Sequence, residues 1–510
     1  MAPNPANPTS EFSFRTRQQH WDRLKAHADS AVDVAIIGGG IVGAGLLREL
    51  CLRSPKEKAR KLFLFEKNDF ASGTSGASSK LIHAGIRYLE QVWLHLKRGR
   101  LREAWKNFVF IVDASRERKI LGRIAPGLVH PKSIYFVLSK SDPRYRLSLF
   151  AGIWFYYLIQ LFQGQFFSPP VTALGPASIA DLAPELDASK VKAVFRFWDS
   201  ETDDARLVIA NLQSANALGG AALNYVEVVD YARKEDGFLV TIKDRQTNET
   251  MTFRSKRLIN ASGPFLDEVR KRQKNASALP DNWIDRVAGS HIDIYPAIAD
   301  RSYYISASDN RLVFALRRDE DGLIYTRVGT TERPLAKNES SERPTPSKGE
   351  LAYLEGLVKE FFPSAIIRIF KADAGIRPLR SQAGLAAFEK SREHDIIEED
   401  GVLHIAGVKL TDFRRVACEI AGRLGYTKDG GSDRTPLTVP GPIYPETSAK
   451  EIVDYTMALH WGDYFRRRRG ALPAVLSQQD PTALRKEFDA FADALAWGAD
   501  RRPTEWEKPL

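Results

Sequence analysis

The stretch VDVAIIGGGIVG, residues 32–43, decides the fold expected for this chain. Its first six residues form an apolar run typical of a buried strand, and the glycines that follow break that run. A second apolar run, LFLF at residues 62–65, ends at the acid Glu66. Strand, glycine turn, helix, strand and acid in this order form the pattern of a dinucleotide-binding unit.

Each part of the pattern has a physical task. Gly38 can adopt a backbone angle that a Cβ would forbid, Gly40 lets the main chain approach a pyrophosphate, and Gly43 lets the helix pack closely on the strand. The unpaired N–H groups at the start of the helix favour phosphate. Glu66 lies 23 residues after Gly43, where an acid can accept hydrogen bonds from a ribose. The alternative interpretation, an ordinary tight turn without a ligand, is the weaker one. The glycine turn does not by itself distinguish NAD from FAD, because both cofactors bind to it.

Residues 68–90, NDFASGTSGASSKLIHAGIRYLE, carry the choice between these two cofactors. The small and hydroxylated residues from 72 to 79 let the backbone lie against a flat ring system and donate hydrogen bonds to phosphate oxygens. The alternative is a flexible Ser/Gly linker, which does not suit the apolar and aromatic residues on both sides.

The same stretch resembles the FAD-dependent glycerol-3-phosphate dehydrogenases, membrane-associated enzymes that pass electrons from glycerol 3-phosphate to quinone. Their pattern of F-A-S-G-T-S, then S-S-K-L-I-H, then R-Y-L-E is present nearly letter for letter. The resemblance extends in blocks over residues 32–430 and more weakly to 475. Its further blocks are residues 194–208, 258–267, 375–379, 391–394 and 405–415.

The chain also departs from the family pattern. Ala288 replaces a lysine and Glu332 replaces an aspartate at positions expected near the substrate, so these two changes concern the identity of the substrate more than the cofactor. The other departures are Gly76, Ala77, Ala84, Arg380, Ser381, Val408 and Asp412.

The resemblance implies an α/β fold, α+β overall. It implies a Rossmann-like FAD-binding domain of the glutathione-reductase/D-amino-acid-oxidase type, a mixed-sheet substrate domain and a C-terminal helical cap. The expected boundaries are an N-terminal arm at 1–30, the FAD-binding domain at 31–113, 190–266 and 375–435, the substrate or membrane-facing domain at 114–189 and 267–374, and the cap at 436–510.

The cofactor implied is FAD. The residues expected to bind it are Gly38, Gly40, Gly43, Glu66, Lys67, Ser72, Thr74, Ser75, Ser79, Lys80, Leu81, His83, Gly85, Val226, Ala261, Gly263, Gly375, Gly407, Val408, Lys409 and Leu410.

The activity implied is oxidation of sn-glycerol 3-phosphate to dihydroxyacetone phosphate by hydride transfer to the flavin N5, with the electrons passed to a membrane quinone. The phosphate needs cations, and guanidinium groups bind it bidentately. The expected substrate-binding residues are Arg87, Tyr88, Arg377, Arg392 and Lys409, and Arg377 is also expected to be catalytic.

His291 is the expected base, because an unperturbed imidazole can accept a proton near neutral pH. A histidine hydrogen-bonded within a strand is the competing interpretation of His291, and a role at the flavin ring is the alternative assigned to His83. Two other functions stay open: an FAD enzyme of the same fold acting on an amino acid or 2-hydroxy acid, and a flavin protein without turnover bound to a membrane or RNA. The acceptor, quinone or oxygen, and the oligomeric state, with a homodimer as one option, also stay open.

The formal charge of +10 over 510 residues indicates an anionic partner: acidic lipid, a phosphorylated substrate or nucleic acid. The expected partners are a phosphorylated small molecule, a quinone and an anionic membrane surface, and no nucleic acid. The two cysteines, Cys51 and Cys418, give no disulfide framework and no metal spacing. The first thirty residues lack the apolar core of a signal peptide. The resemblance, with which these features agree, implies a peripheral position on the cytoplasmic side of the inner membrane.

Two apolar stretches are ambiguous. LSLFAGIWFYYLIQLF, residues 147–162, is shorter than the roughly 20 residues that span a bilayer, and it suits an interfacial helix and a buried helix equally. The helical stripe of Leu101, Ala104, Trp105, Phe108, Ile111 and Val112 is interpreted as core packing.

The chain ends carry two further expectations. Residues 1–20 are expected to be a mobile or loosely packed arm. Residues 449–469 are expected to be helical, and their terminal run of four arginines, 466–469, is interpreted as a solvated helix end.

Overall fold

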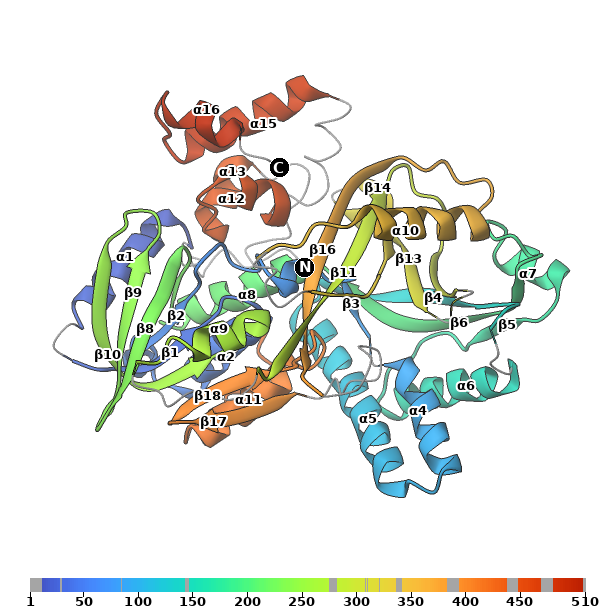
Figure 1. The fold of residues 1–510 in the computed structure, drawn as a ribbon, viewed down its shortest axis with the longest axis horizontal. Coiled ribbons are helices and arrows are strands. Elements are labelled where there is room, and N and C mark those ends of the chain that lie inside the picture. The colour runs from blue at the N-terminus through green and yellow to red at the C-terminus, as the bar shows by residue number, and fades with distance from the viewer. Residues whose placement is uncertain are drawn as a thin grey trace. The chain divides into compact units, whose positions relative to one another are not determined.

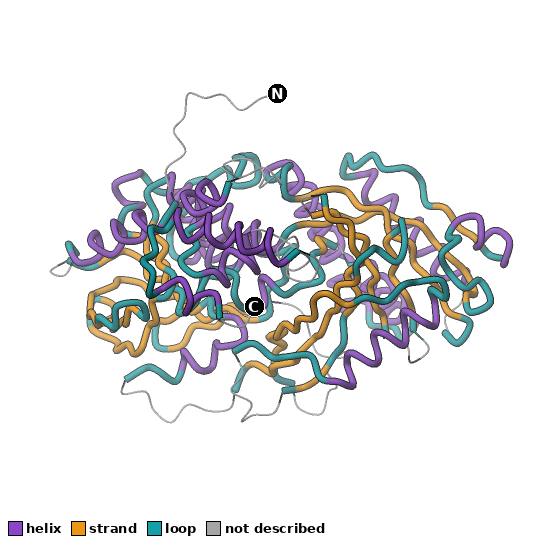
Figure 2. The backbone as a smooth tube through the Cα atoms, turned by 90° about the horizontal axis from the view of Figure 1, so that it is seen from above, coloured by secondary structure: helices purple, strands orange, loops and turns teal. Residues whose placement is uncertain are grey.

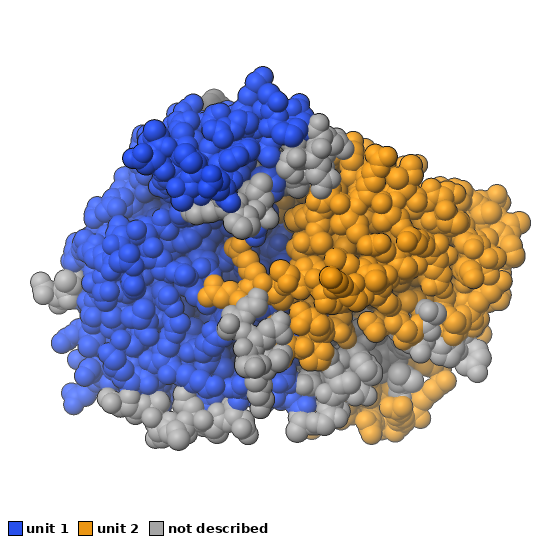
Figure 3. Space-filling view, turned by 45° about the horizontal axis from the view of Figure 1, so that its top comes forward, with its two compact units in different colours: residues 1–77, 204–287, 376–510 blue, residues 78–203, 288–375 orange. Residues whose placement is uncertain are grey.

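A computed structural model gives the fold. It describes residues 12–27, 30–83, 85–142, 146–274, 282–307, 309, 311–320, 322–335, 342–382, 394–437, 448–468 and 480–507. The chain divides into two compact units, unit 1 with residues 1–77, 204–287 and 376–510 and unit 2 with residues 78–203 and 288–375 (Figure 3). Both units combine helices with strands, as Figure 2 shows by colour, which confirms the expected mixed α/β class.

The unit boundaries differ from the expected domain boundaries. Residues 78–113, 190–203 and 375 were expected in the FAD-binding domain and lie in unit 2, whereas residues 267–287 were expected in the substrate domain and lie in unit 1. The reason is strand pairing: β6 (Val191–Thr202) pairs along its length with β4 (Val129–Ser139). Residues 78–128, which precede β4, therefore belong to unit 2 together with β4 and β6.

Unit 1 is built on an eight-stranded sheet within the described residues (Figure 1). The apolar run 32–37 forms its central strand β1, parallel to β2 on one side and β10 on the other. Apolar runs of this kind suit strands buried on both faces. The main path is β17 (Asp395–Glu399), β18 (Val402–Ala406), β10 (Thr250–Asn260), β1 (Val32–Ile37), β2 (Leu62–Phe65) and β7 (Ala221–Leu223), with β9 (Gly237–Asp244) beside β10 and β8 (Val226–Lys234) beside β9.

A helix follows the glycine turn, as the sequence pattern predicts, and further helices pack beside it. The helix after the glycine turn, α2 (Ile41–Arg53), packs against α8 and α11. Cys51 in α2 is buried and Cys418 in α11 is half-buried. The other helices here are α3 (Lys56–Ala59), η1 (Thr74–Gly76), α8 (Asp204–Ala217), η2 (Gly263–Phe265), α9 (Leu266–Arg270) and α11 (Phe413–Arg423).

The expectation of a loosely packed N-terminal arm is wrong for α1 (Phe14–Lys25). Ser13 caps this helix, and its side chains Trp21 and Leu24 are buried in the core of the sheet. Arg17 forms a buried ion pair with Asp244 at 3.0 Å. Apolar side chains at helical spacing in a polar segment therefore fix the segment in unit 1.

The cap after residue 448 is helical, as expected, but not one helix. α12 (Ala449–Thr456) ends at Met457, whose φ of +52° breaks the helix. The chain continues with α13 (Trp461–Asp463), the π-helical turn η3 (Tyr464–Arg468), α15 (Pro481–Ala494) and α16 (Arg501–Trp506). Aromatic rings such as Trp461 and Phe488 pack at its centre.

The interpretation of the arginine run as a solvated helix end is wrong for Arg467 and Arg468. Both are buried and bind Asp69, which follows Glu66 by three residues. The Arg468 Nη1 and Nη2 groups donate to the Asp69 carboxylate at 3.0 and 2.7 Å. Arg467 also binds Asp463 at 2.8 Å. The cap is thus fastened to the cofactor loop of unit 1, and Arg469 lies outside the described residues.

Unit 2 is built on a ten-stranded, mainly antiparallel sheet within the described residues. β4 and β12 pair in parallel, which makes the sheet mixed, as expected. The main path is β15 (Arg333–Pro334), β11 (Ile284–Ile294), β14 (Leu323–Gly329), β13 (Leu312–Glu320), β12 (Ser302–Ser306), β4, β6 and β3 (Leu81–Ile82), with β16 (Ile369–Arg380) beside β11 and β5 (Val171–Ala173) beside β6.

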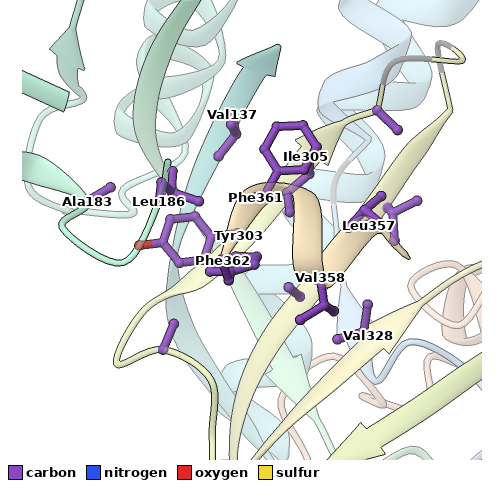
Figure 4. Packing of buried hydrophobic residues seen from close by; sticks show 14 of the residues in the cluster. Val137, Ala183, Leu186, Tyr303, Ile305, Val328, Leu357, Val358, Phe361 and Phe362 are labelled. Atoms are coloured by element: carbon purple, nitrogen blue, oxygen red, sulfur yellow. The ribbon is translucent and has the colours of Figure 1, made fainter. Parts of the chain in front are cut away.

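Side chains alternate between the two faces of this sheet, as the period of a strand requires. Tyr303 packs under α10 (Lys348–Phe361) and near α7 (Pro176–Leu182) in the cluster that Figure 4 shows. Its neighbour Tyr304 faces the opposite cluster. That cluster is covered by α4 (Ile86–Lys97), α5 (Leu101–Ile124) and α6 (Arg146–Phe162).

The 147–162 stretch forms α6, which is buried on one side and exposed on the other. Ile153, Tyr156 and Ile159 are buried, whereas Phe155 and Phe162 are exposed. Among the described residues, no helix is both long enough and apolar enough to cross a membrane.

Core packing is the wrong interpretation for two members of the α5 stripe. Ala104 and Ile111 are buried, but Leu101 is 68% exposed and Trp105 is 65% exposed. The stripe spans more of the helix surface than the core of unit 2 covers.

Candidate active site

The glycine turn of unit 1 has the close packing that its sequence predicts. Gly38 has a φ of +114°, and a Cβ there would lie 2.6 Å from the Ala261 carbonyl oxygen. A Cβ at Gly43 would overlap the Gly38 carbonyl oxygen. At Gly40 a Cβ would meet only Ser75, at 3.0 Å from its hydroxyl oxygen. The space beside Gly40 is therefore a cradle that any larger side chain would begin to fill.

Glu66 is held at the end of β2 by backbone N–H groups. Gly39 donates to its Oε2 at 2.7 Å and Asn68 donates to its Oε1 at 2.8 Å. Burial raises the pKa of Glu66 from its usual value. A carboxylate has about four acceptor positions, so two remain for ribose hydroxyls. The position and the bonding capacity of Glu66 fit the adenosine end of FAD.

The hydroxyl-rich stretch is an ordered turn and not a linker. The Ser75 hydroxyl accepts from the Ile41 N–H at 2.9 Å, at the start of α2. The Thr74 hydroxyl donates to the Ile376 carbonyl oxygen at 2.5 Å. The Ile41 N–H is thus bonded to the Ser75 hydroxyl oxygen. Because this oxygen accepts there, the Ser75 hydroxyl proton points toward other neighbouring acceptors. A phosphate is such an acceptor, so these residues fit the pyrophosphate.

Two other predicted cofactor residues lie beside Glu66. The Val226 N–H donates to the Glu66 carbonyl oxygen at 2.8 Å, which joins β8 to the end of β2. The Lys67 ammonium lies 4.1 Å from the centre of the Phe265 ring. Phe265 belongs to the turn that follows β10, so both predicted residues border the same part of unit 1.

The turn after β10 is organised by Asn260. Its Nδ2 donates to the Leu266 carbonyl oxygen and to His404 Nδ1, both at 3.0 Å, and its Oδ1 accepts from the Ser262 N–H at 3.2 Å. Burial lowers the pKa of His404 to about 4, so the ring is a neutral acceptor. These bonds hold the turn in which the Ala261 carbonyl oxygen lies against Gly38.

The turn at residues 407–410 follows β18, and Gly407 has a φ of +72°. It ends in a hydrogen bond from the Asp412 N–H to the Lys409 carbonyl oxygen at 3.0 Å. The Asp412 carboxylate binds Arg415 at 2.7 Å and His394 at 3.2 Å. Hydrogen bonding to Asp412 raises the pKa of His394. This departure from the family pattern is thus engaged in ion pairs at the start of α11.

In unit 2 the structure brings together two residues that the sequence analysis assigned separately. The Ser79 hydroxyl oxygen lies 3.0 Å from His291 Nε2. His291 is buried in β11, and a Cβ at the facing Gly329 of β14 would overlap its ring. On the other side, His291 Nδ1 lies 3.8 Å from an oxygen of Asp373. The Ser79 hydroxyl, the His291 imidazole and the Asp373 carboxylate therefore lie next to one another in this order in space.

Asp373 belongs to a buried ion network that the sequence analysis missed. Arg327 donates to both oxygens of Asp293 at 2.9 Å and to Asp373 at 2.6 Å. Burial opposes ionisation of Asp373, but Arg327 and Lys371 outweigh it and lower its pKa. Burial raises the pKa of Asp293. Charged residues inside apolar strand runs were the available signal.

Lys80 lies at the edge of a second charged cluster in unit 2. It has a φ of +57°, and its ammonium lies 3.7 Å from Asp203. Arg318 binds Glu201 at 2.8 Å and Glu320 at 3.2 Å. Burial opposes ionisation of Glu320, but Lys80 and Arg318 hold its pKa below the usual range.

The remaining predicted residues divide as follows. His83 is exposed and Gly85 has a φ of +79°. Gly375 and Arg377 lie in β16, while Leu81 forms β3. The side chains of Arg87 and Tyr88, both in α4, and the whole of Arg392 lie outside the described residues. Their roles, like the other assigned roles, stay predictions.

Comparison with known proteins agrees with this geometry. The model of the family "FAD dependent oxidoreductase" matches residues 33–410. The aerobic glycerol-3-phosphate dehydrogenase of Staphylococcus saprophyticus is 30% identical over 408 residues, 78% of this chain and 67% of that protein. The enzyme of the same name from Staphylococcus aureus strain MRSA252 is 30% identical over 421 residues, 80% of this chain and 70% of that protein.

Solved structures show the same fold. The glycerol-3-phosphate dehydrogenase from Bacillus halodurans complexed with FAD has a TM-score of 0.70 and 22% identity, over 97% of this chain and 96% of that chain. The L-alpha-glycerophosphate oxidase from Mycoplasma pneumoniae with FAD bound has a TM-score of 0.57 and 18% identity, over 78% and 95%. The cofactor prediction is confirmed, and this chain belongs to the FAD dependent oxidoreductase family and, within it, to the aerobic glycerol-3-phosphate dehydrogenase group of enzymes.

Proposed function

We propose that this enzyme oxidises sn-glycerol 3-phosphate to dihydroxyacetone phosphate and passes the electrons to a membrane quinone. The observation that carries the proposal is the buried His291, placed between the Ser79 hydroxyl and the Asp373 carboxylate. A secondary alcohol loses a proton and a hydride on oxidation, and this arrangement provides the proton acceptor. The names of the curated relatives supply the substrate class.

His291 acts as the base through its Nε2. We assign the ring proton to Nδ1, toward Asp373, so that Nε2 is the acceptor and the Ser79 hydroxyl donates to it. The proton of the substrate hydroxyl passes to Ser79, and the Ser79 proton passes to His291. The ionised Asp373, kept so by Arg327, stabilises the charged ring that results. FAD, when bound, supplies N5 as the acceptor of the hydride.

The substrate phosphate is assigned to cations. Arg377 and Lys409 follow the two glycines of their motifs, and Arg87, Tyr88 and Arg392 complete the set. Planar guanidinium groups match phosphate oxygens in pairs. The glycine turn, Glu66 and Ser75 hold the cofactor, as their contacts in unit 1 support.

The acceptor is assigned to a quinone, and the enzyme to the cytoplasmic face of the inner membrane as a peripheral protein. The chain has one dinucleotide turn of this quality, at residues 38–43, so no equivalent site for NAD is evident in the sequence. The charge of +10 suits an anionic surface.

A second candidate is oxidation of an amino acid or 2-hydroxy acid in the same fold. Ala288, which replaces the family lysine, is fully buried in β11, three residues before His291. A glycine oxidase from Geobacillus kaustophilus shares the fold at a TM-score of 0.51. Loss of a cation near the substrate favours a substrate without a phosphate.

Anaerobic flavin reduction tests the choice. We expect the yellow holoenzyme to bleach with glycerol 3-phosphate, and not with glycine or lactate, and to be reoxidised by a soluble quinone but not by NAD. Bleaching with an amino acid or a 2-hydroxy acid, together with no response to glycerol 3-phosphate, would establish the second candidate. Reoxidation by oxygen as fast as by quinone would instead change the acceptor.

A further inference from the structure

Unit 1 contains an open cavity between α1 and the C-terminal cap. Its volume is about 540 Å³, which is within the range of small-molecule sites. The described residues that line it come from the first half of α1, the turn between β9 and β10, and the cap. None of them is among the residues assigned to the flavin or to glycerol 3-phosphate. The cavity is therefore a candidate site for a second ligand.

The cap supplies an apolar and rigid part of the cavity wall. Trp497 is 6% exposed, and its ring packs edge-on against Phe491 with the ring centres 5.3 Å apart. Leu459, which is buried, and Leu495, which is half-buried, also line the cavity. The organic part of a ligand can therefore rest on a fixed apolar surface.

Arg501 supplies a positive charge at the same wall. Its guanidinium carbon lies 4.4 Å from the centre of the Trp497 ring, and its Nη2 donates to the Leu459 carbonyl oxygen at 2.9 Å. A guanidinium has about five N–H donors, so most of them remain for a ligand. Asp493 binds the neighbouring Arg502 instead, and no carboxylate in the described part of the chain forms an ion pair with Arg501.

Acidic side chains close to the cavity are already bound. Asp244, at the turn between β9 and β10, forms a buried ion pair with the lining residue Arg17 at 3.0 Å. Glu505 of α16 binds His460 at 2.7 Å. No acidic residue is among the described residues of the lining, which include three arginines. The cavity therefore favours an anion.

Two glutamines add hydrogen-bonding groups to the lining. Gln19 is exposed on α1 and forms no side-chain hydrogen bond within the described residues. Gln246 places one end of its amide 3.1 Å from His460 Nε2, which leaves the other end for a ligand. Together with Arg501, these amides bring polar groups from separate segments of the chain to one cavity.

We propose that this cavity binds a small, soluble organic phosphate ester. A phosphate monoester has three terminal oxygens and a larger negative charge than a carboxylate, so groups from separate segments can bind it at once. A carboxylate has only two oxygens, which one guanidinium already matches. The organic part of the ester rests on Trp497 and Leu495, and the ligand links α1 to the cap. This proposal is independent of the substrate and the acceptor proposed above.

Isothermal titration of the FAD-loaded enzyme with phenyl phosphate tests the proposal. We expect saturable binding, about tenfold weaker binding of inorganic phosphate, which lacks the apolar part, and no binding of phenol, which lacks the charge. Arg501→Gln should weaken the binding of phenyl phosphate by about tenfold or more, because charge-assisted hydrogen bonds are lost. The matched control is Arg485→Gln, which should bind as the parent does. Arg485 also lies over an aromatic ring of the cap, 4.9 Å from the centre of Trp506, but does not line the cavity.

A second variant keeps the test valid even if Arg501→Gln fails to fold. Gln19→Glu places a negative charge at an exposed position of the lining and should weaken binding by a similar factor. Phenyl phosphate should raise the melting temperature of the parent, because it binds the folded state, and have a smaller effect on either variant.

Turnover with glycerol 3-phosphate should stay at the parent value in both variants, so failure here is distinct from failure of the proposed reaction. Absence of binding to the parent would overturn the proposal. Binding that neither variant weakens would also overturn it and would assign the ester to the substrate site.

Discussion

Two buried carboxylate–arginine networks, one in each unit, differ in how completely they are closed. In unit 1, Asp69 binds Arg467 and Arg468, and none of the three side chains is more than 7% exposed. In unit 2, Arg327 is bound between Asp293 and Asp373, and the Asp373 side chain is 23% exposed. The open end of the second network faces His291.

The difference indicates two uses of buried charge. In a closed network each charge is already compensated, so no group is left to bind a substrate or to exchange a proton. Removing one of its charged side chains lowers the stability of the fold. An open network next to a titratable ring can stabilise charge that develops during a reaction. We therefore infer a structural role for the Asp69 network and, for the Asp373 network, a role in supporting the proposed base.

The largest expected effect is on turnover. His291→Asn keeps a hydrogen-bonding side chain of similar size but cannot accept a proton at working pH. Turnover with glycerol 3-phosphate should fall by about 10²- to 10⁴-fold in steady-state dye reduction. Flavin content and melting temperature should stay near parent values. A parallel loss of melting temperature would make His291 a structural histidine and remove the contrast between the networks.

The next effect is on stability. Asp69→Ala removes the carboxylate that the buried Arg468 binds and one of the two that Arg467 binds, which should cost about 3–5 kcal/mol in the free energy of unfolding, measured by urea titration of the holoenzyme. The control is Asp454→Ala, which breaks the exposed pair with Lys450 on α12 and should cost less than about 1 kcal/mol. Equal costs for the two variants would contradict the closed, structural role of Asp69.

A smaller effect concerns the pH profile. Asp373→Asn removes the negative charge whose oxygen lies 3.8 Å from His291 Nδ1. Arg327 retains its ion pair with Asp293 in this variant. The charged ring is then less favoured, so the acidic limb of kcat/KM against pH should move down by about one pH unit. Asp69→Asn should lower stability without moving this limb. An unmoved limb in Asp373→Asn would separate the network of unit 2 from catalysis.

The smallest effect concerns His394, which pairs with Asp412 and Glu419. These pairs are partly exposed and serve as a comparison for the two buried networks. Hydrogen bonding to Asp412 and Glu419 raises the pKa of His394, with burial and Arg415 opposing. A group with a raised folded pKa contributes stability that is complete below its unfolded value of 6.5 and disappears as the pH rises through the folded value. The stability difference between the parent and His394→Gln should therefore shrink above pH 6.5 in thermal melts. A constant difference would show that the ring does not titrate there.

Local backbone requirements explain what the sequence could predict. Gly38 and Gly43 were found because a positive φ or a close approach restricts the residue type at one position. Strand β1 followed from its apolar run, and Glu66 from its place at the end of the next run. The roles of Arg87 and Arg392 came from the family resemblance and stay untested.

The networks were missed because their partners are distant in sequence. Arg468 and Asp69 are 399 residues apart, and an arginine run by itself looks like a solvated helix end. The stripe at Leu101 and Trp105 was misinterpreted for a related reason. Periodicity shows that one face of a helix is apolar but not what covers that face.

The bond between Asp69 and Arg468 also sets an order of events during synthesis. Arg468 is made 399 residues after Asp69, which at 5–20 residues per second is roughly 20 to 80 s later. During that interval Asp69, in the loop that follows Glu66, lacks the two arginines that bind it in the folded chain. The packing of this loop is therefore completed only after the helical cap has been synthesised.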